Sequence, residues 1–153
     1  MEDVSDPPFR ALCKEQGADV VYTEFISSDG LIRDGAKSLK KLDIFDYERP
    51  IGIQLYGHIL ESMVDATHLA VQASPELIDI NYGCPVRKIA NRGAGAGMLQ
   101  NLPLMMEMTK AIVEASPLPV TVKTRLGWDE NSKIIVELAE RLQDLGIAAL
   151  TIH

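Results

Sequence analysis

The sequence alternates between short runs rich in β-branched residues and longer amphipathic segments, and this alternation limits the folds open to the chain. The predicted strands cover residues 18–24, 50–57, 76–83, 118–124 and 148–153. The predicted helices cover residues 5–18, 58–73, 102–116 and 132–146. Strands that alternate with helices form parallel sheets joined by right-handed crossovers. The chain is therefore predicted to be an α/β protein.

Two parallel architectures fit this pattern, an open doubly wound sheet and a (β/α)8 TIM-type barrel. The open sheet favours a G-x-G-x-x-G turn after its first strand, and no such turn is present there. A full barrel needs roughly 250 residues, whereas this chain has 153. The last predicted strand has no helix after it, and the first helix has no strand before it. We therefore expect residues 1–153 to form one incomplete barrel domain.

The composition narrows the class of protein. An apolar fraction of 46% and a charged fraction of 24% are those of a globular protein, and no apolar run is long enough to cross a membrane. The acidic, proline-containing start does not resemble an export signal, and two cysteines do not make a disulfide framework. We expect a cytoplasmic protein. The net charge of −7 argues against a nucleic-acid footprint on this chain by itself.

Polar residues occur where the predicted strands end. They are Gln54, Asn81, Lys123 and His153, with Cys84 and Arg125 just beyond two of these ends. The carboxyl ends of parallel strands share one face, on which α/β and barrel enzymes place their chemistry. Lys123 alternates with Thr121, opposite Val120 and Val122, so in a barrel it points inward, where a lysine needs an anionic or electron-rich partner.

Cys84 follows Gly83 and precedes Pro85 on a predicted loop. An arbitrary cysteine is most often a small buried hydrophobic residue. On a loop at strand ends, however, a thiol can act as a nucleophile or as a proton donor. No histidine lies close to it in sequence, and a thiol that donates a proton needs no activating base.

Three further patterns lead to structural predictions. Phe9, Leu12 and Cys13 share one face of the first helix, which predicts a core position for Cys13. The glycine-rich segment 91–101 lacks the spacing of a phosphate loop and is predicted to be a mobile flap with glycine hinges at 93, 95 and 97. His58 and His68 lack a partner at metal-ligand spacing, so we expect no metal site.

Several segments resemble one enzyme family in sequence and in order. They are MEDVSDPPFR, IQLYG, DINYGCPVRKI with GAGAGMLQ, VTVKTRLGWD and LTIH. The chain is similar over its whole length to the tRNA-dihydrouridine synthases, in the amino-terminal part of their catalytic barrel. N-x-G-C-P-x-x-K is the most specific of these motifs. Gly97 departs from the pattern, in which alanine is expected.

The resemblance implies an FMN site across the strand ends. Gln54 would hydrogen-bond the pyrimidine edge of the flavin, and Lys123 would face its polar end. His153 would approach the ribityl or phosphate side, and the backbone of Met1 would also contact the flavin.

The resemblance also implies the reaction, which reduces uridine in tRNA to 5,6-dihydrouridine. NADPH would reduce FMN, flavin N5 would deliver hydride to uracil C6, and Cys84 would protonate C5. The base would be flipped out of the RNA. Asn81 would hold the uracil, while Lys88 and Arg125 would contact RNA.

The family's first strand, last barrel strands and carboxy-terminal helical RNA-binding domain have no counterpart in these residues, so the chain alone is expected to bind FMN weakly and to be inactive. Three alternatives stay open at this point. They are a flavin enzyme acting on free pyrimidines, similar to dihydroorotate dehydrogenase, a Schiff-base aldolase using Lys123, and a half-barrel module that self-associates without catalysis. The tRNA position, and NADPH rather than NADH, do not follow from the residues.

Overall fold

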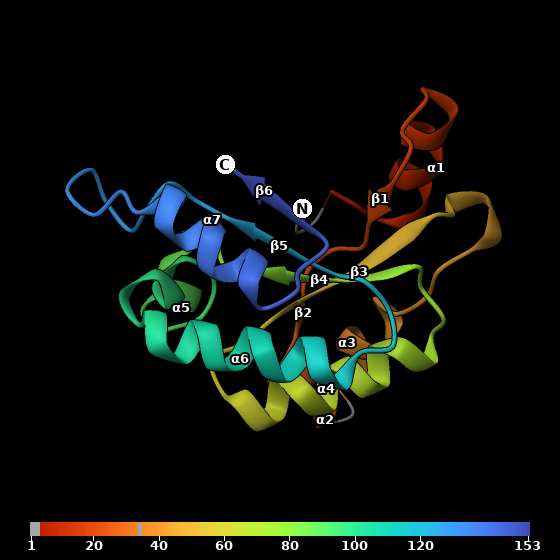
Figure 1. Cartoon of the computed structure of the whole chain (residues 1–153). Coiled ribbons are helices and arrows are strands. Elements are labelled where there is room, and N and C mark those ends of the chain that lie inside the picture. Colours follow the sequence, from red (N-terminus) through yellow and green to blue (C-terminus); the bar gives the residue numbers. More distant parts are fainter. Residues whose placement is uncertain (1–3, 34) are drawn as a thin grey trace.

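A computed structural model describes residues 4–33 and 35–153 as a six-stranded sheet with helices between the strands (Figure 1). The strands are β1 (Val21–Tyr22), β2 (Ile26–Ser27), β3 (Ile51–Tyr56), β4 (Leu77–Asn81), β5 (Val120–Thr124) and β6 (Ala149–Ile152). Their order is β1-β3-β4-β5-β6, β2 also pairs with β3, and every pairing is parallel. The predicted α/β class is confirmed, and the architecture is that of an incomplete (β/α)8 barrel. The short strand β2 was not predicted.

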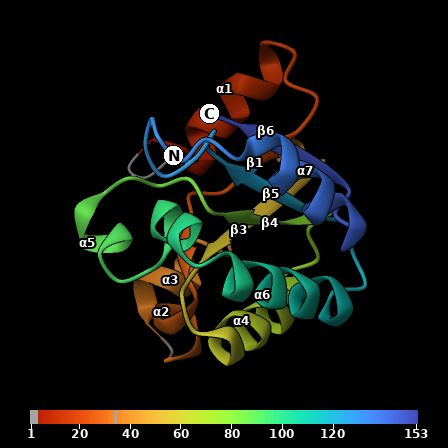
Figure 2. The same ribbon diagram turned by 60° about the vertical axis from the view of Figure 1, so that its left-hand side comes forward.

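Seven α-helices are found in the described residues. They are α1 (Pro7–Glu15), α2 (Ser28–Ile32), α3 (Ala36–Lys40), α4 (Leu60–Gln72), α5 (Arg87–Ala90), α6 (Leu102–Ala115) and α7 (Ile135–Asp144). Two 3-10 segments, η1 (Asp46–Glu48) and η2 (Gly95–Gln100), complete the elements. Figures 1 and 2 show α2, α4 and α6 on one face of the sheet, with α1 at its β1 edge. Because the longer helices pack on that one face, the inward face of the strands stays accessible for a site.

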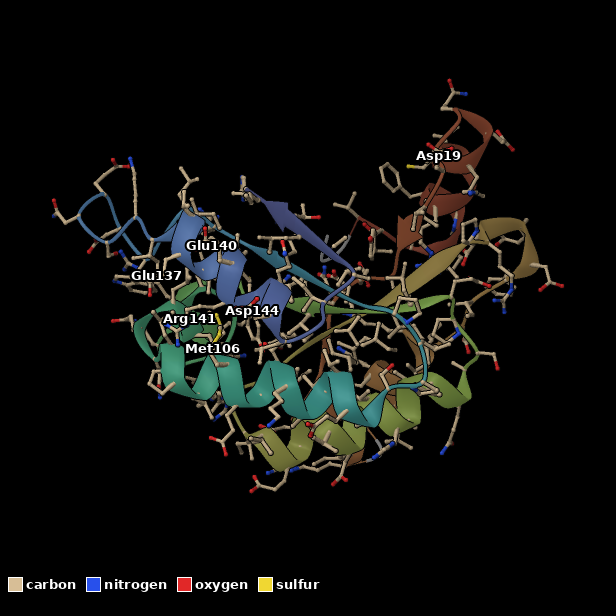
Figure 3. The ribbon with its side chains drawn as sticks, viewed as in Figure 1. Asp19, Met106, Glu137, Glu140, Arg141 and Asp144 are labelled. Carbon is tan, nitrogen blue, oxygen red and sulfur yellow. The ribbon has the colours of Figure 1, made fainter. Side chains whose placement is uncertain are left out.

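The hydrophobic core lies between the sheet and α4 and α6. The fully buried side chains there include Ile53, Ile78, Ile80, Val122, Met63, Met105 and Met108. Burial of each large side chain contributes roughly 1.5–3 kcal/mol. The methionines Met105 and Met108 of α6 are thus packing residues of the core. Leu138 and Leu142 attach α7 to this core, whereas Glu137, Glu140 and Asp144 on the same helix are exposed (Figure 3).

The predicted core face of α1 is wrong. Phe9 and Leu12 are 39% and 52% exposed and Cys13 is only half-buried, while Arg10 is 4% exposed. The guanidinium of Arg10 donates to Glu48 Oε2 at 3.0 Å, and this pair occupies the inner side of the helix. Periodicity shows which residues share a face of a helix. It does not show which face is buried, and in α1 the buried face carries Arg10, which pairs with Glu48. Asp6 caps the start of α1, since its carboxylate accepts from the backbone N–H of Phe9 at 3.0 Å.

The glycine-rich segment is packed and does not form a flap, so that prediction is also wrong. Gly95, Ala96, Gly97, Met98 and Leu99 are all buried in η2. A Cβ at Gly97 would lie 2.1 Å from the carbonyl oxygen of Ala90, and one at Gly95 would lie 2.8 Å from that of Cys84. These glycines permit close backbone contact. The backbone also explains the departure at position 97, because an alanine there would collide with Ala90.

No helix among residues 4–33 and 35–153 is long and apolar enough to cross a membrane. The same residues contain no group of three or more His, Cys, Asp or Glu side chains that could hold a metal ion.

Candidate active site

The register of the sheet places polar side chains side by side on its inward face. Gln54 is opposite Asp79, and Asp79 is opposite Thr121. One step further along, Asn81 is opposite Lys123, which is opposite Thr151. Since side chains alternate between the two faces of a strand, all six point to the same side. The inward face predicted from the alternation around Lys123 is therefore present.

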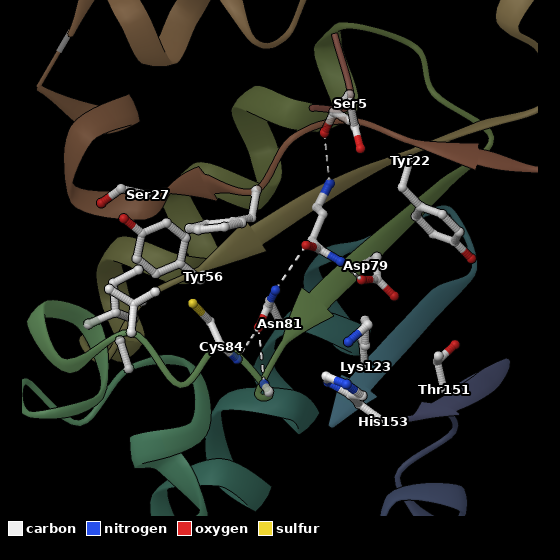
Figure 4. Close-up of a pocket in the computed structure, with 18 of the residues that line it drawn as sticks. Ser5, Tyr22, Ser27, Tyr56, Asp79, Asn81, Cys84, Lys123, Thr151 and His153 are labelled. Carbon is white, nitrogen blue, oxygen red and sulfur yellow. Dashed lines mark hydrogen bonds between the residues drawn. The ribbon is translucent and has the colours of Figure 1, made fainter. Parts of the chain in front are cut away.

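A cavity of about 920 Å³ lies against this face (Figure 4). Its lining includes Gln54, Asn81, Cys84, Lys88, Lys123, Arg125 and His153, which are seven of the eight site residues predicted from the sequence. The predicted flavin contact of Met1 lies outside the described residues. Gln54 and Asn81 are buried, Cys84, Lys123 and Arg125 are half-buried, and Lys88 and His153 are exposed. Small-molecule sites are concave and commonly measure roughly 300–1,000 Å³.

Asp79 lies at the floor of the cavity and was given no role in the sequence prediction. Its Oδ2 accepts a hydrogen bond from Gln54 Nε2 at 2.6 Å, and its Oδ1 accepts from Thr121 Oγ1 at 2.5 Å. Burial raises the pKa of Asp79 to about 6, although the two hydrogen bonds and the positive charge of Lys123 oppose the rise. A buried carboxylate that accepts from neutral donors is thus part of the site.

The hydrogen bonds continue from Gln54 to the Cys84 loop (Figure 4). Asn81 Nδ2 donates to Gln54 Oε1 at 2.9 Å. Asn81 Oδ1 in turn accepts from the backbone N–H groups of Gly83 and Cys84 at 3.0 and 2.9 Å. We call the connected series Thr121–Asp79–Gln54–Asn81–Cys84 N–H the amide relay. It links three neighbouring strands to the loop that carries the thiol.

The Cys84 loop is held from other directions as well. The carbonyl oxygen of Cys84 accepts from the backbone N–H of Ala96 at 2.9 Å. Arg125 Nε donates to the carbonyl oxygen of Gly83 at 2.6 Å. On the other face of the sheet, Tyr82 is 1% exposed and its hydroxyl lies 3.0 Å from Thr109 Oγ1 on α6. The half-buried thiol therefore extends from a backbone that is fixed on several sides.

Tyr22 on β1 is a further cavity residue that the sequence prediction missed. It pairs with Gly52, where a Cβ would lie 2.7 Å from the Tyr22 ring. Burial raises the pKa of the Tyr22 hydroxyl, the charge of Asp79 raises it further, and a hydrogen bond with Thr121 opposes both. Asp79 and Thr121 had only one available signal, their alternation with Asn81 and Lys123 on the same strands, and Tyr22 had none.

Comparison with known proteins identifies the family of the chain. A sequence model of the family described as Dihydrouridine synthase matches residues 1–153. The chain is 38% identical over 154 residues to "tRNA-dihydrouridine synthase B" of Pseudomonas putida, of which it covers 45%. It is 37% identical to the proteins of the same name from Vibrio parahaemolyticus and Xanthomonas campestris, of which it covers 48% and 46%. All of this chain takes part in each of these matches.

The fold is that of an incomplete (β/α)8 barrel, with a cavity at the carboxyl ends of its strands. The chain belongs to the dihydrouridine synthase family. It spans slightly less than half the length of the relatives named above.

Proposed function

We propose that this chain provides the flavin- and uracil-binding face of an enzyme that reduces uridine in tRNA to 5,6-dihydrouridine. The observation that carries the proposal is the convergence of Gln54, Asn81, Cys84 and Lys123 on one cavity at the carboxyl ends of parallel strands. The relatives are named as tRNA-dihydrouridine synthases, and these four residues lie in the segments whose sequence resembles that family. A cytoplasmic location, where tRNA is available, is part of the proposal.

The residues around the cavity fit FMN by the chemistry of their polar groups. Gln54 uses one of its amide hydrogens in the amide relay and retains the other for the pyrimidine edge of a flavin. Lys123 supplies a positive charge beside that edge, and His153 supplies a polar ring for the ribityl or phosphate side. Met1 remains a predicted backbone contact. When bound, FMN supplies the two-electron reducing chemistry, with NADPH as the source of electrons.

Cys84 is the proposed proton donor. Saturation of the uracil C5=C6 bond requires one proton in addition to a hydride equivalent, and the Cys84 Sγ–H would supply it to C5. The backbone hydrogen bonds at Cys84 N and O hold the residue in place. Asn81 keeps one amide hydrogen outside the amide relay, and this hydrogen would bind the uracil. Positioned proton transfer of this kind typically contributes roughly 10²–10⁴-fold to a rate.

A basic segment beside Cys84 is the proposed contact with RNA phosphates. From Ile80 to Met106 the sequence contains no Asp or Glu, although the net charge of the whole chain is −7. The three cations in that interval, Arg87, Lys88 and Arg92, are all exposed. Lys88, Arg92 and Arg125 line the cavity. Phosphate contacts supply most of the affinity of nucleic-acid binding, so positive charge at the mouth would hold the RNA while one uridine is flipped inward.

These 153 residues alone are expected to bind FMN weakly and to show no detectable turnover, because they correspond to less than half of the named relatives. The test is therefore an FMN titration followed by flavin fluorescence. We expect saturable binding that Lys123→Ala weakens by roughly tenfold or more, since hydrogen bonds to charged groups contribute about 1.5–3 kcal/mol. Lys133→Ala is the matched control, because Lys133 is exposed, pairs with Glu130 and does not line the cavity. Equal affinity of the Lys123→Ala variant and the wild type would refute the proposed site.

A further inference from the structure

Each end of the amide relay is formed by groups that can act only as hydrogen-bond acceptors or only as hydrogen-bond donors. At one end, the ionised carboxylate of Asp79 can only accept, and it accepts from Gln54 Nε2 and Thr121 Oγ1 at 2.6 and 2.5 Å. At the other end, the backbone N–H groups of Gly83 and Cys84 can only donate, and both donate to Asn81 Oδ1. The two side-chain amides lie between these ends.

These two ends leave one consistent orientation for both amides. Gln54 has to turn its NH₂ toward Asp79, so its oxygen faces Asn81. Asn81 then has to turn its NH₂ toward Gln54, so its oxygen faces the Cys84 loop. If either amide were reversed, a donor would oppose a donor at one link and an acceptor would oppose an acceptor at the next. Gln54, Asp79 and Asn81 are 7%, 3% and 7% exposed, so water does not readily compensate such a reversal.

We propose that Asp79 is a positioning residue that sets the direction of the amide relay and thereby fixes Gln54, Asn81 and the backbone of Cys84 in the arrangement that binds the ligands. The link to uridine reduction rests on the function proposed above, whereas the orientation of the amides does not. Asp79 acts through Gln54 and Asn81 and is not itself a group that reacts.

The direction of the relay decides what the cavity offers to a ligand. Each NH₂ group uses one hydrogen in the relay, so one N–H of Gln54 and one N–H of Asn81 remain. Both Gln54 and Asn81 line the cavity. The pair is therefore set to bind acceptor atoms, such as the carbonyl oxygens of a pyrimidine or of the flavin pyrimidine edge. Reversal of either amide would exchange the positions of its oxygen and its nitrogen, so the remaining N–H would no longer lie where it does now.

Protonation of Asp79 removes the constraint at the carboxylate end, because a carboxylic acid can also donate. The groups that face Asp79 are Gln54 on β3, Thr121 and Lys123 on β5 and Tyr22 on β1. Burial raises the pKa of Asp79 to about 6, and Lys123 opposes this rise by its charge. Both the ionised and the protonated state of Asp79 are thus accessible in ordinary buffers. The amide relay can therefore be observed with Asp79 ionised and with Asp79 protonated.

The test is a ¹H–¹⁵N NMR titration of the chain from pH 4.5 to 8 without flavin or RNA. We expect the side-chain amide signals of Gln54 and Asn81 and the backbone amide signal of Cys84 to shift together, with one midpoint near 6. Asp79→Asn should abolish the common transition while the signals of the core stay in place. Thr121→Val should move the midpoint upward, because the lost hydroxyl is a donor that lowers the pKa of Asp79.

Two results would overturn the proposal. In the first, the Gln54 side chain titrates but the Cys84 amide does not. In the second, the common transition persists in the Asp79→Asn variant. If that variant does not fold, the wild-type titration and the Thr121→Val variant still decide the matter. Failure of FMN to bind would leave these signals unchanged, so the positioning role and the proposed function can fail separately.

Discussion

Two acidic residues three positions apart at β4 have opposite environments. Glu76, just before the strand, accepts from the backbone N–H of Ile51 at 2.8 Å and from Arg49 at 2.5 Å. Burial alone would raise the pKa of Glu76, but the Ile51 hydrogen bond and the hydrogen bond and charge of Arg49 outweigh it and lower the pKa. Asp79 has only neutral hydrogen-bond donors, and burial raises its pKa to about 6.

This difference separates two uses of a carboxylate in one parallel sheet. At the amino-terminal edge, Glu76 joins Arg49 to the start of β3 and supports the fold. On the inward face near the carboxyl ends, Asp79 organises polar groups around a cavity and is less favourable to stability at neutral pH. In barrels the amino-terminal face commonly serves stability and the carboxyl-terminal face serves chemistry. The four predictions that follow test this division, beginning with the largest effect.

Asp79→Asn should stabilise the protein at pH 7. The pKa of Asp79 is about 6 in the folded protein against an ordinary value of 3.8, so the folded state binds more protons between these values and stability falls as the pH rises through them. Two pKa units correspond to at most about 3 kcal/mol. Urea unfolding from pH 4 to 8 should show this fall in the wild type and not in the variant. Parallel curves for the two proteins would contradict the account.

Gly97→Ala should destabilise the packed segment behind Cys84. The added Cβ would lie 2.1 Å from the carbonyl oxygen of Ala90, and overpacking of this kind costs roughly 1–3 kcal/mol. Gly83→Ala is the comparison, because its nearest contact would be an ordinary 3.4 Å. Thermal melting should fall clearly in the first variant and little in the second. An unchanged melting temperature for Gly97→Ala would favour the flexible flap that the sequence suggested.

Tyr82→Phe should cost about 1 kcal/mol of stability, the usual contribution of a buried hydrogen bond. Burial raises the pKa of Tyr82, and its hydroxyl contacts Thr109 on the helix-covered face of the sheet. FMN affinity should not change, although Tyr82 lies between Asn81 and Gly83 in the motif. Tyr47→Phe, at a side chain 55% exposed, is the control. A loss of flavin binding without a loss of stability would assign Tyr82 to the site.

Glu76→Gln should have the smallest effect, a loss below about 1 kcal/mol, because the side chains of Arg49 and Glu76 are 33% and 38% exposed and solvent screens the ion pair. The folded-state pKa of Glu76 is lowered, so its contribution is present above the ordinary value of 4.5 and disappears as the pH falls. Urea unfolding at pH 7 and at pH 3 should therefore show a difference from the wild type only at pH 7. A change in FMN affinity in this variant would show that Glu76 also affects the cavity, and would contradict the division between the two ends of β4.

The sequence predicted the strands and the polar residues at their ends, because alternation and helical periodicity are local properties. The sequence alone assigned Gln54, Asn81, Lys123 and His153 to one face, and all four line the cavity. The buried side of α1 could not be predicted, since it depends on Glu48, which is 38 positions away from Arg10. The close contact of Gly97 with Ala90 could not be predicted either, because a glycine-rich sequence is equally compatible with a flexible hinge.

The role of Asp79 is a further case in which the sequence signal was incomplete. Its alternation with Asn81 placed it on the correct face of β4. Its partners, however, come from β3 and β5, and only the register of the sheet brings Gln54 and Thr121 to the two oxygens of one carboxylate. Hydrogen bonds between strands that are distant in sequence can be read only from the folded chain.

The most direct test of the central claim is an NMR map of FMN binding on the ¹⁵N-labelled chain. We expect added FMN to shift the signals of the side-chain amides of Gln54 and Asn81 and of the backbone amides of Cys84 and Lys123. The signals of Ile51 and Glu76 at the opposite edge of the sheet should stay in place. Another cavity is lined in part by Lys37 and Lys40 of α3. Shifts centred on the opposite edge or on that cavity would show that the strand-end face is not the flavin site.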